Sequence, residues 1–188
     1  MKTIFFLLMI SISLSGFLKA GTGLEVGDKV PNFKAVADDG TVWQSNDHIG
    51  KNYLVVYFYP GAMTGGCTKQ ACAYRDFKTD IEKADAQVIG ISGDNIDGLQ
   101  LFKKTYNLNF TLLSDNSGAI AAIFGVPTRD GVTFTKEVND INYTLERGTT
   151  ASRWTFIIDK DGKVVYKNED VNPTSDPQEV LSFLKNNS

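Results

Sequence analysis

Two hydrophobic periodicities alternate along the chain, and the changes between them predict the order of its elements. Residues 53–59 form a nearly continuous apolar run, which is typical of a strand buried on both faces. Residues 67–84 place apolar or small side chains every three or four positions, and this spacing predicts a helix. Further along the chain, strands are predicted over residues 87–92 and 110–113, and helices over residues 95–106 and 117–124.

Turn residues mark two hairpins and a closing helix. Two Asp-Gly turns each join a pair of short strands, at residues 33–36 and 41–43 and at residues 154–158 and 163–166. Residues 176–185 predict a helix that begins at Asp176-Pro177. Strands that alternate with helices, followed by a hairpin and a helix, predict an α/β fold. No internal repeat or linker divides the chain, so we expect a single domain.

The N-terminus has a different character. Lys2 supplies a positive charge, residues 4–18 are mostly apolar, and Ala20 is a small residue at a suitable cleavage point. This pattern predicts a secretory signal peptide over residues 1–20, followed by one domain over residues 21–188. The apolar run is shorter than the roughly 20 residues of a membrane span, and no cysteine is near for a lipid anchor. We therefore expect an exported protein, periplasmic or secreted, with no stable membrane association after cleavage.

Composition narrows the classes of partner. The chain has 188 residues, of which 42% are hydrophobic and 22% charged, which is enough for one substantial core. The predicted signal peptide contains Lys2 and Lys19 and no acidic residue, so its removal moves the formal net charge from −3 to −5. A modestly acidic protein without a basic tract is a poor candidate for binding nucleic acid.

Candidate chemistry lies where the apolar run 53–59 ends. Pro60 ends the run, a short polar turn follows, and Cys67 stands where the predicted helix begins. Backbone N–H groups and the helix dipole favour an anion there, so this thiol should ionise more readily than a free cysteine. Thr64 can aim its hydroxyl at the sulfur. The same residues also fit ordinary helix capping and a buried structural cysteine, so both interpretations stay open at this point.

Cys72 is the only other cysteine. Two cysteines in an exported protein normally indicate a structural disulfide. Five positions along a regular α-helix, however, separate the Cα atoms by about 8.7 Å, whereas a disulfide needs them within about 7 Å. Either this segment is not helical, or a bond between Cys67 and Cys72 forms only when it unwinds.

A family resemblance favours the reactive interpretation. The string Pro60-x-x-x-Thr64-x-x-Cys67 is similar to the active-site motif of the peroxiredoxins, the AhpC/TSA family. Residues 67–76 resemble its bacterioferritin-comigratory, or Q-type, branch, in which four residues separate the attacking and resolving cysteines. The resemblance covers residues 30–185. It implies a thioredoxin fold with an N-terminal β-hairpin extension, in a single domain that needs no cofactor and no metal.

The resemblance also implies a catalytic cycle. Cys67 would be the peroxidatic cysteine, which attacks hydrogen peroxide or an organic hydroperoxide and becomes a sulfenic acid. Cys72 would resolve it as an intramolecular Cys67–Cys72 disulfide, which a thioredoxin-like donor re-reduces. Such an enzyme serves antioxidant defence and redox homeostasis, and we expect a monomer or weak homodimer.

Further site residues follow from the same resemblance. Thr64 would hydrogen-bond the thiolate and the peroxide, Pro60 would shield the sulfur, and the N–H groups around Gly66 would donate to the peroxide. Arg153 begins a segment that resembles the family's Arg-x-Thr-Phe-x-x-Asp and would supply the active-site cation. Gln70 matches a position near the family's active site. The alternatives are a solvated arginine at a strand edge and a surface glutamine on a helix.

Other features fit less well. His48, the only histidine, could pair with a cysteine or complete a copper site with two thiolates, but a solvated loop histidine is the simpler interpretation. A general dithiol oxidoreductase would have Cys-x-x-Cys, which this chain lacks.

Two further features have no assigned function, and Arg75 is interpreted as structural. Residues 127–152, rich in Thr, Asn, Asp and Gly, give the weakest pattern and are longer than the family's usual connection.

Overall fold

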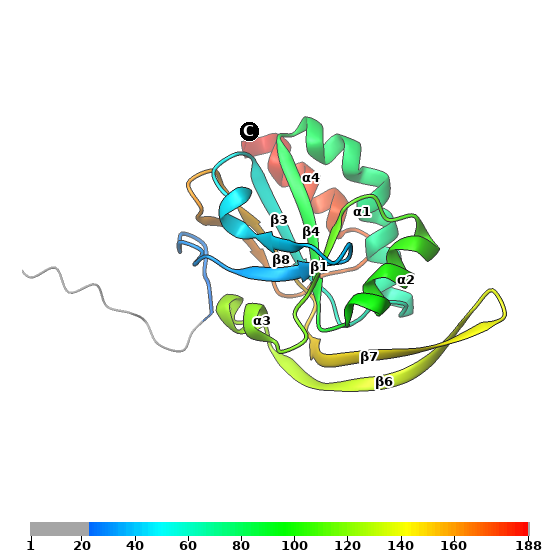
Figure 1. The fold of residues 1–188 in the computed structure, drawn as a ribbon. Coiled ribbons are helices and arrows are strands. Elements are labelled where there is room, and N and C mark those ends of the chain that lie inside the picture. The colour runs from blue at the N-terminus through cyan, green and yellow to red at the C-terminus, as the bar shows by residue number, and fades with distance from the viewer. Residues whose placement is uncertain (1–22, 188) are drawn as a thin grey trace, which may run out of the picture.

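A seven-stranded mixed sheet forms the centre of the molecule, and helices lie on both of its faces (Figure 1). The computed structural model describes residues 23–187, so the predicted signal peptide lies outside the described residues. The strands of the sheet, in spatial order, are β2 (Val42–Gln44), β1 (Lys34–Ala37), β5 (Thr111–Ser114), β4 (Ala86–Ser92), β3 (Tyr53–Phe58), β8 (Trp154–Ile158) and β9 (Val164–Asn168). The helices are α1 (Gly65–Lys83), α2 (Ile96–Tyr106), α3 (Ala119–Phe124), α4 (Asp176–Asn187) and the short 3-10 helix η1 (Ser45–Asp47).

The central strand β3 explains the long apolar run. It pairs parallel with β4 and antiparallel with β8, so both of its edges are hydrogen-bonded. Its side chains alternate between two cores. Val55 and Tyr57 pack with α1, α2 and α4, whereas Val56 and Phe58 pack with α3 and the N-terminal hairpin. A strand that is buried on both faces has apolar residues at successive positions, as the sequence of β3 predicted.

The predicted hairpins and helices are present, and the α/β architecture is confirmed. Strands β1 and β2 pair antiparallel around the Asp-Gly turn, and β8 and β9 do the same around the second. Strand β1 also pairs with β5, so the N-terminal hairpin extends the central sheet and is not a separate unit. The sheet order places the end of β3, and with it the Pro60 turn, in the middle of the molecule.

The segment that gave no clear pattern forms a long hairpin. Strands β6 (Thr128–Val138) and β7 (Ile141–Ala151) make a separate two-stranded sheet that extends past α2 (Figure 1). Its inner face contributes Phe134, Val138, Tyr143 and Leu145 to the same core as α1 and α2. Threonines and charged residues between these positions dilute the apolar alternation. The tip uses Asn139 and Asp140 in left-handed conformations, with φ of 50° and 63°. An Asn-Gly or Asp-Gly turn would have been the stronger sequence signal.

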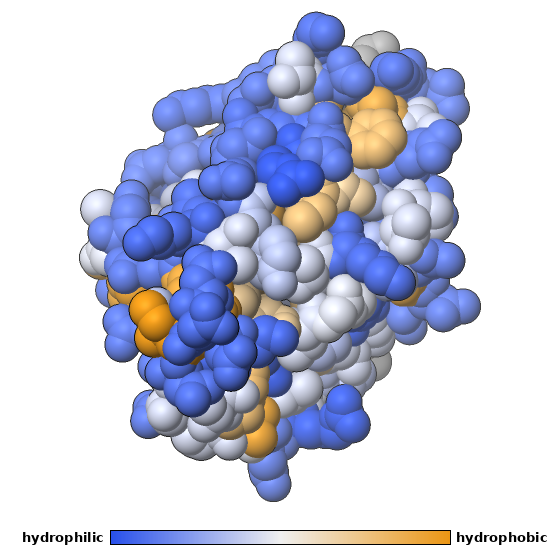
Figure 2. Space-filling view, turned by 90° about the vertical axis from the view of Figure 1, so that its right-hand side faces the viewer, coloured by the Kyte–Doolittle hydropathy of each residue, from blue (hydrophilic) through white to orange (hydrophobic). Residues whose placement is uncertain are grey.

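The surface over α2 and the hairpin tip is mostly hydrophilic, with apolar side chains in small separate areas (Figure 2). Among the described residues, no helix has both the length and the apolar character that crossing a membrane requires.

Candidate active site

The first turn of α1 holds the candidate nucleophile. Thr64 occupies the N-cap position, and Cys67 is the third residue of the helix, with 1% of its surface exposed. The first N–H groups of a helix have no acceptor within it, so they form an electropositive end beside the sulfur. The Thr64 hydroxyl donates to the Gly61 carbonyl oxygen at 2.9 Å. This differs from the predicted donation to the thiolate, although the Thr64 oxygen can still accept from a peroxide O–H.

Arg153 is the cation at the sulfur. Its Nη2 donates to Sγ of Cys67 at 3.3 Å, and its Nη1 donates to Oε1 of Gln70 at 2.5 Å. Gly66 makes room for this approach, because a Cβ atom there would lie 3.3 Å from Arg153 Nη2. The structure thus brings together Cys67, Gln70, Gly66 and Arg153. The alternative of a surface Gln70 is wrong, since Gln70 is fully buried. Arg153 is half-buried, and its guanidinium contacts Cys67 and Gln70.

A buried carboxylate, Asp176, lies behind Gln70. Its Oδ2 accepts hydrogen bonds from Gln70 Nε2 at 2.8 Å, from the Tyr74 hydroxyl at 2.6 Å and from the Thr155 hydroxyl at 3.0 Å. Its other oxygen is buried without a hydrogen-bond partner. Burial raises the pKa of Asp176 above its ordinary value, and the three hydrogen bonds act in the opposite direction. A continuous chain of hydrogen bonds therefore runs from the sulfur through Arg153 and Gln70 to this carboxylate.

The sequence around Asp176 predicts only the start of the last helix. Asp-Pro is common at helix starts, so nothing in the local sequence distinguishes a buried acceptor from an exposed cap. The partners of Asp176 come from α1 and β8, far away along the chain, and only the fold brings them together.

Aromatic rings form the inner wall of this region. Tyr57 stacks on Tyr74 and on Tyr59, with ring centroids 4.6 Å and 5.4 Å apart. Burial raises the pKa of Tyr57 well above its usual value, and the negative charges of the Cys67 sulfur and Asp176 raise it further. These phenols therefore stay neutral, and the wall adds no competing negative charge near the thiol.

Cys72 lies in the same continuous helix as Cys67, and both cysteines are free. The helical alternative is thus the correct one for this state, and the Cα atoms of the two residues are separated by about 8.7 Å in regular helical geometry. Cys72 is partly exposed, whereas Cys67 is buried. A disulfide between them requires the first turns of α1 to unwind.

The remaining candidates lie elsewhere. His48 stacks on Trp43, in the core on the face of the sheet opposite to Cys67, so it cannot share a metal or a proton with the cysteines. Arg75 donates to the Tyr106 carbonyl at 2.7 Å and joins α1 to the end of α2, as its structural interpretation predicted. Pro60 stands two residues after the end of β3, at the start of the turn that leads to Thr64.

Comparisons with known proteins agree with this geometry. The family model described as AhpC/TSA matches residues 26–167. Peroxiredoxin Q of the rice chloroplast (Oryza sativa subsp. japonica) is 39% identical over 160 residues, which are 85% of this chain and 66% of that protein. A protein of Coxiella burnetii that carries the name peroxiredoxin bcp is 39% identical over 141 residues, which are 75% of this chain and 85% of that protein.

Solved structures show the same fold. Peroxidoxin BcpB of Mycobacterium tuberculosis aligns with a TM-score of 0.73 at 29% identity, over 87% of this chain and 97% of that one. Peroxiredoxin Q of Xanthomonas campestris aligns with a TM-score of 0.67 at 26% identity, over 82% and 90%. The predicted thioredoxin fold is confirmed.

A buried cysteine in the first turn of a helix lies 3.3 Å from an arginine, on a thioredoxin fold, and the chain belongs to the AhpC/TSA family. Within that family it falls in the branch of peroxiredoxin Q and the bacterioferritin-comigratory proteins, as its cysteine spacing predicted.

Proposed function

We propose that this protein is a thiol-dependent peroxidase that reduces hydrogen peroxide and organic hydroperoxides, with Cys67 as the nucleophile. The observation that carries the proposal is the 3.3 Å contact between Arg153 Nη2 and Sγ of Cys67 at the start of α1. A guanidinium and a helix N-terminus both favour the thiolate, which is the reactive form of cysteine. Family membership and the peroxiredoxin names of its relatives support the same reaction.

In the proposed first step, the Cys67 thiolate attacks one peroxide oxygen. The O–O bond breaks, the other oxygen leaves as water or an alcohol after taking a proton, and Cys67 becomes a sulfenic acid. Negative charge develops on the leaving oxygen, so fixed donors are needed there. The Arg153 guanidinium and the N–H groups around Gly66 are the donors that this site offers, and Pro60 would shield the sulfur from water.

In the second step, the Cys72 thiolate attacks the Cys67 sulfur and expels hydroxide, which becomes water, leaving a disulfide. An external dithiol then reduces the disulfide by thiol exchange. The donor is proposed to be a thioredoxin-like protein. If the N-terminal signal acts as predicted, the protein works in the periplasm or outside the cell in antioxidant defence, as a monomer or weak homodimer.

The test uses the two cysteines against each other. Cys67→Ser should abolish peroxide reduction, because a serine hydroxyl is hardly ionised near neutral pH. Cys72→Ser should still react once and stop at a sulfenic acid, which a sulfenate-trapping reagent and mass spectrometry detect. The roles are reversed if Cys67→Ser completes one turnover while Cys72→Ser completes none. Absence of peroxide consumption by the unmutated protein with any dithiol donor would overturn the proposal.

A further inference from the structure

A buried ion pair joins the β6–β7 hairpin to the segment after β4. Arg147 Nε lies 3.0 Å from Asp94 Oδ1, and the two side chains are 5% and 1% exposed. Backbone contacts fix the same junction, since the Asn95 N–H donates to the Glu146 carbonyl and the Gly148 N–H to the Gly93 carbonyl, each at 3.0 Å. Buried ion pairs contribute little net stability, because desolvation offsets their attraction. The other groups that the pair contacts therefore matter more than its own contribution to stability.

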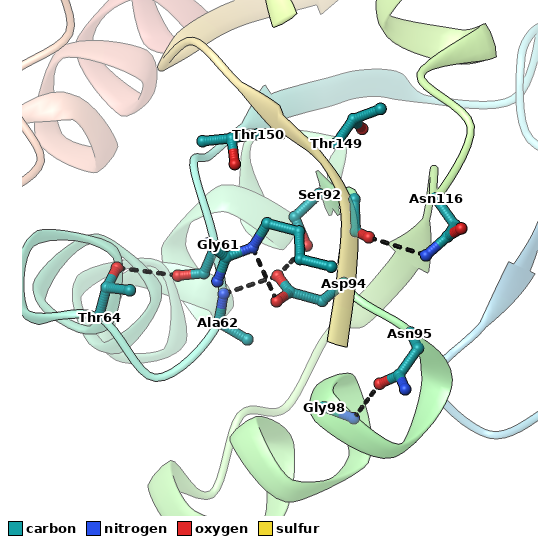
Figure 3. Close-up of polar contacts among 12 residues, drawn as sticks. Gly61, Ala62, Thr64, Ser92, Asp94, Asn95, Gly98, Asn116, Thr149 and Thr150 are labelled. Atoms are coloured by element: carbon teal, nitrogen blue, oxygen red, sulfur yellow. Dashed lines mark hydrogen bonds and ion pairs between the residues drawn. The ribbon is translucent and has the colours of Figure 1, made fainter. Parts of the chain in front are cut away.

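The second carboxylate oxygen of Asp94 points to the turn before Cys67. Its Oδ2 accepts the Ala62 N–H at 2.7 Å and the Ser92 hydroxyl at 2.7 Å (Figure 3). Charge-assisted bonds to a carboxylate are stronger than those between neutral groups. Asp94 thus fixes the backbone of the turn at a point five residues before the nucleophile.

The other half of the pair touches the preceding residue. A Cβ atom on Gly61 would lie 1.8 Å from Arg147 Cζ, so the guanidinium packs directly on the Gly61 backbone. Any side chain there would displace it. Arg147 Nη2 is buried without a hydrogen-bond partner, so the guanidinium packs against Gly61 although one of its donors is left unsatisfied. The contact therefore depends on how the turn and the hairpin are placed relative to one another.

The turn needs external support. Met63 adopts a left-handed conformation with φ of 63°, which a non-glycine residue takes up only when its surroundings hold it there. Within the turn, the Thr64 hydroxyl donates to the Gly61 carbonyl (Figure 3). The two residues contacted by the ion pair, Gly61 and Ala62, thus lie at the fixed end of the segment that carries Thr64 and Cys67.

We infer that Asp94 and Arg147 are positioning residues for peroxide reduction, and that the β6–β7 hairpin thereby forms part of the functional site. The inference rests on the proposed role of Cys67 as the nucleophile. Arg153 stabilises negative charge on the sulfur, whereas the Asp94–Arg147 pair fixes the position of the turn. Loss of the pair should misalign Thr64 and the helix start with the peroxide while the ionisation of Cys67 is retained.

The test compares two reactions of one thiol. Arg147→Gln, Asp94→Asn and the control Arg129→Gln, an exposed arginine of the same hairpin, are each made with Cys72→Ser, so that Cys67 is the only cysteine. Stopped-flow gives the rate of reaction with hydrogen peroxide per titrated thiol, and iodoacetamide alkylation against pH gives the thiolate profile. We expect the peroxide rate to fall about 10- to 100-fold in the first two variants, the effect of a misplacement near 1 Å, with the alkylation profile unchanged.

A folded Arg147→Gln protein that reacts with peroxide as fast as Arg129→Gln would overturn the inference, and so would equal losses in both reactions. If the charge variants do not fold, Gly61→Ala and Arg147→Lys replace them. The first displaces the guanidinium, and the second keeps its charge but not its planar contact, so both should show the same selective loss. Failure of the parent Cys72→Ser protein to react with peroxide would instead overturn the proposed function.

Discussion

Asp94 and Asp176 are both fully buried, and they contact the chain before and after Cys67, yet their surroundings differ in kind. Asp94 faces the guanidinium of Arg147 and uses its second oxygen for the Ala62 N–H. Asp176 receives only neutral donors, from Gln70, Tyr74 and Thr155, all on one oxygen. The first carboxylate is compensated by a cation, and the second is not.

This difference suits the two carboxylates to different roles, since Asp94 holds the turn before Cys67 and Asp176 orients Gln70. A carboxylate that is paired with a cation can hold the backbone N–H of Ala62 in place, which suits the turn before the nucleophile. An uncompensated carboxylate orients Gln70, and through it Arg153, while its own ionisation is disfavoured by burial. The following variants test this separation, beginning with the arginine at the sulfur.

The largest effect is expected at Arg153. Arg153→Gln removes the charged donor from the Cys67 sulfur, so peroxide reduction should slow by about 10²- to 10³-fold, as when one donor is lost from an oxyanion site. The pH at which Cys67 becomes reactive should rise, because a nearby cation favours the thiolate. Stopped-flow rates and alkylation against pH measure both. Arg129→Gln is the neutral control, whereas Arg147 is buried and paired and is unsuitable as one. Equal small effects at Arg153 and Arg129 would mean that another cation serves the site.

Asp94→Asn should be the most destabilising of the carboxylate changes. A single amide oxygen cannot serve both Arg147 and the turn, so a buried guanidinium loses its counter-charge. Breaking a buried pair in this way costs about 3–5 kcal/mol. Urea unfolding at neutral pH, followed by circular dichroism, gives the difference from the unmutated protein. A loss below about 1 kcal/mol would show that water or another group compensates Arg147.

Asp176→Asn should have a smaller effect that depends on pH. The amide oxygen can keep all three hydrogen bonds, and the new NH₂ group replaces an oxygen that has no partner. An unsatisfied buried donor costs about 1–3 kcal/mol, but the variant no longer ionises a buried carboxyl. Because the folded pKa is raised, the unmutated protein loses stability as pH rises from about 3.9, the unfolded value, through the folded pKa.

The stability of Asp176→Asn relative to the unmutated protein should therefore be lowest near pH 4 and higher at pH 7. Urea unfolding at several pH values checks this trend. A stability difference that does not change with pH would mean that Asp176 titrates alike in the folded and unfolded states.

The smallest expected effect is a change in the hydrogen exchange of α1 between the contacts made by Asp94 and those made by Asp176. Oxidation to a Cys67–Cys72 disulfide should unwind the start of α1, and Gly65 and Gly66 ease this by about 1 kcal/mol each relative to alanine. Amide hydrogen exchange over residues 65–74 should be faster in the oxidised protein than in the reduced one. The Ala62 amide, which Asp94 holds, should stay protected in both. Identical exchange over residues 65–74 in both states, with the disulfide confirmed by mass, would contradict the unwinding.

Much of the fold was predictable because its signals are local. The two-sided burial of β3 and the helical spacing of α1 can be recognised from residues that are neighbours in the sequence, and the Asp-Gly turns mark two hairpins. The β6–β7 hairpin escaped prediction because its strands are rich in threonine and charge, and because its inner residues are recognisable only against α2. Its tip also lacks the glycine that usually marks a tight turn.

The candidate site divides in the same way. Cys67, Thr64 and Arg153 were predicted from the sequence, because each stands in a short string that resembles one of the family's. The structure places Cys67 and Arg153 in contact. The roles of Asp176 and Arg147 were not found. Gln70 and Asp176 stand 106 positions apart, and Asp94 and Arg147 stand 53 apart, so no local pattern relates them.

The sequence by itself determined the order of strands and helices outside the β6–β7 hairpin, the place of Cys67 at the start of a helix, and the spacing that keeps Cys72 out of bonding range while α1 is helical. These follow from backbone geometry over a few residues, which neighbours along the chain control. Only the tertiary structure decided which buried carboxylate meets a cation and which meets neutral donors. That choice depends on side chains brought together from distant strands and helices, where exclusion of water makes each pairing decisive.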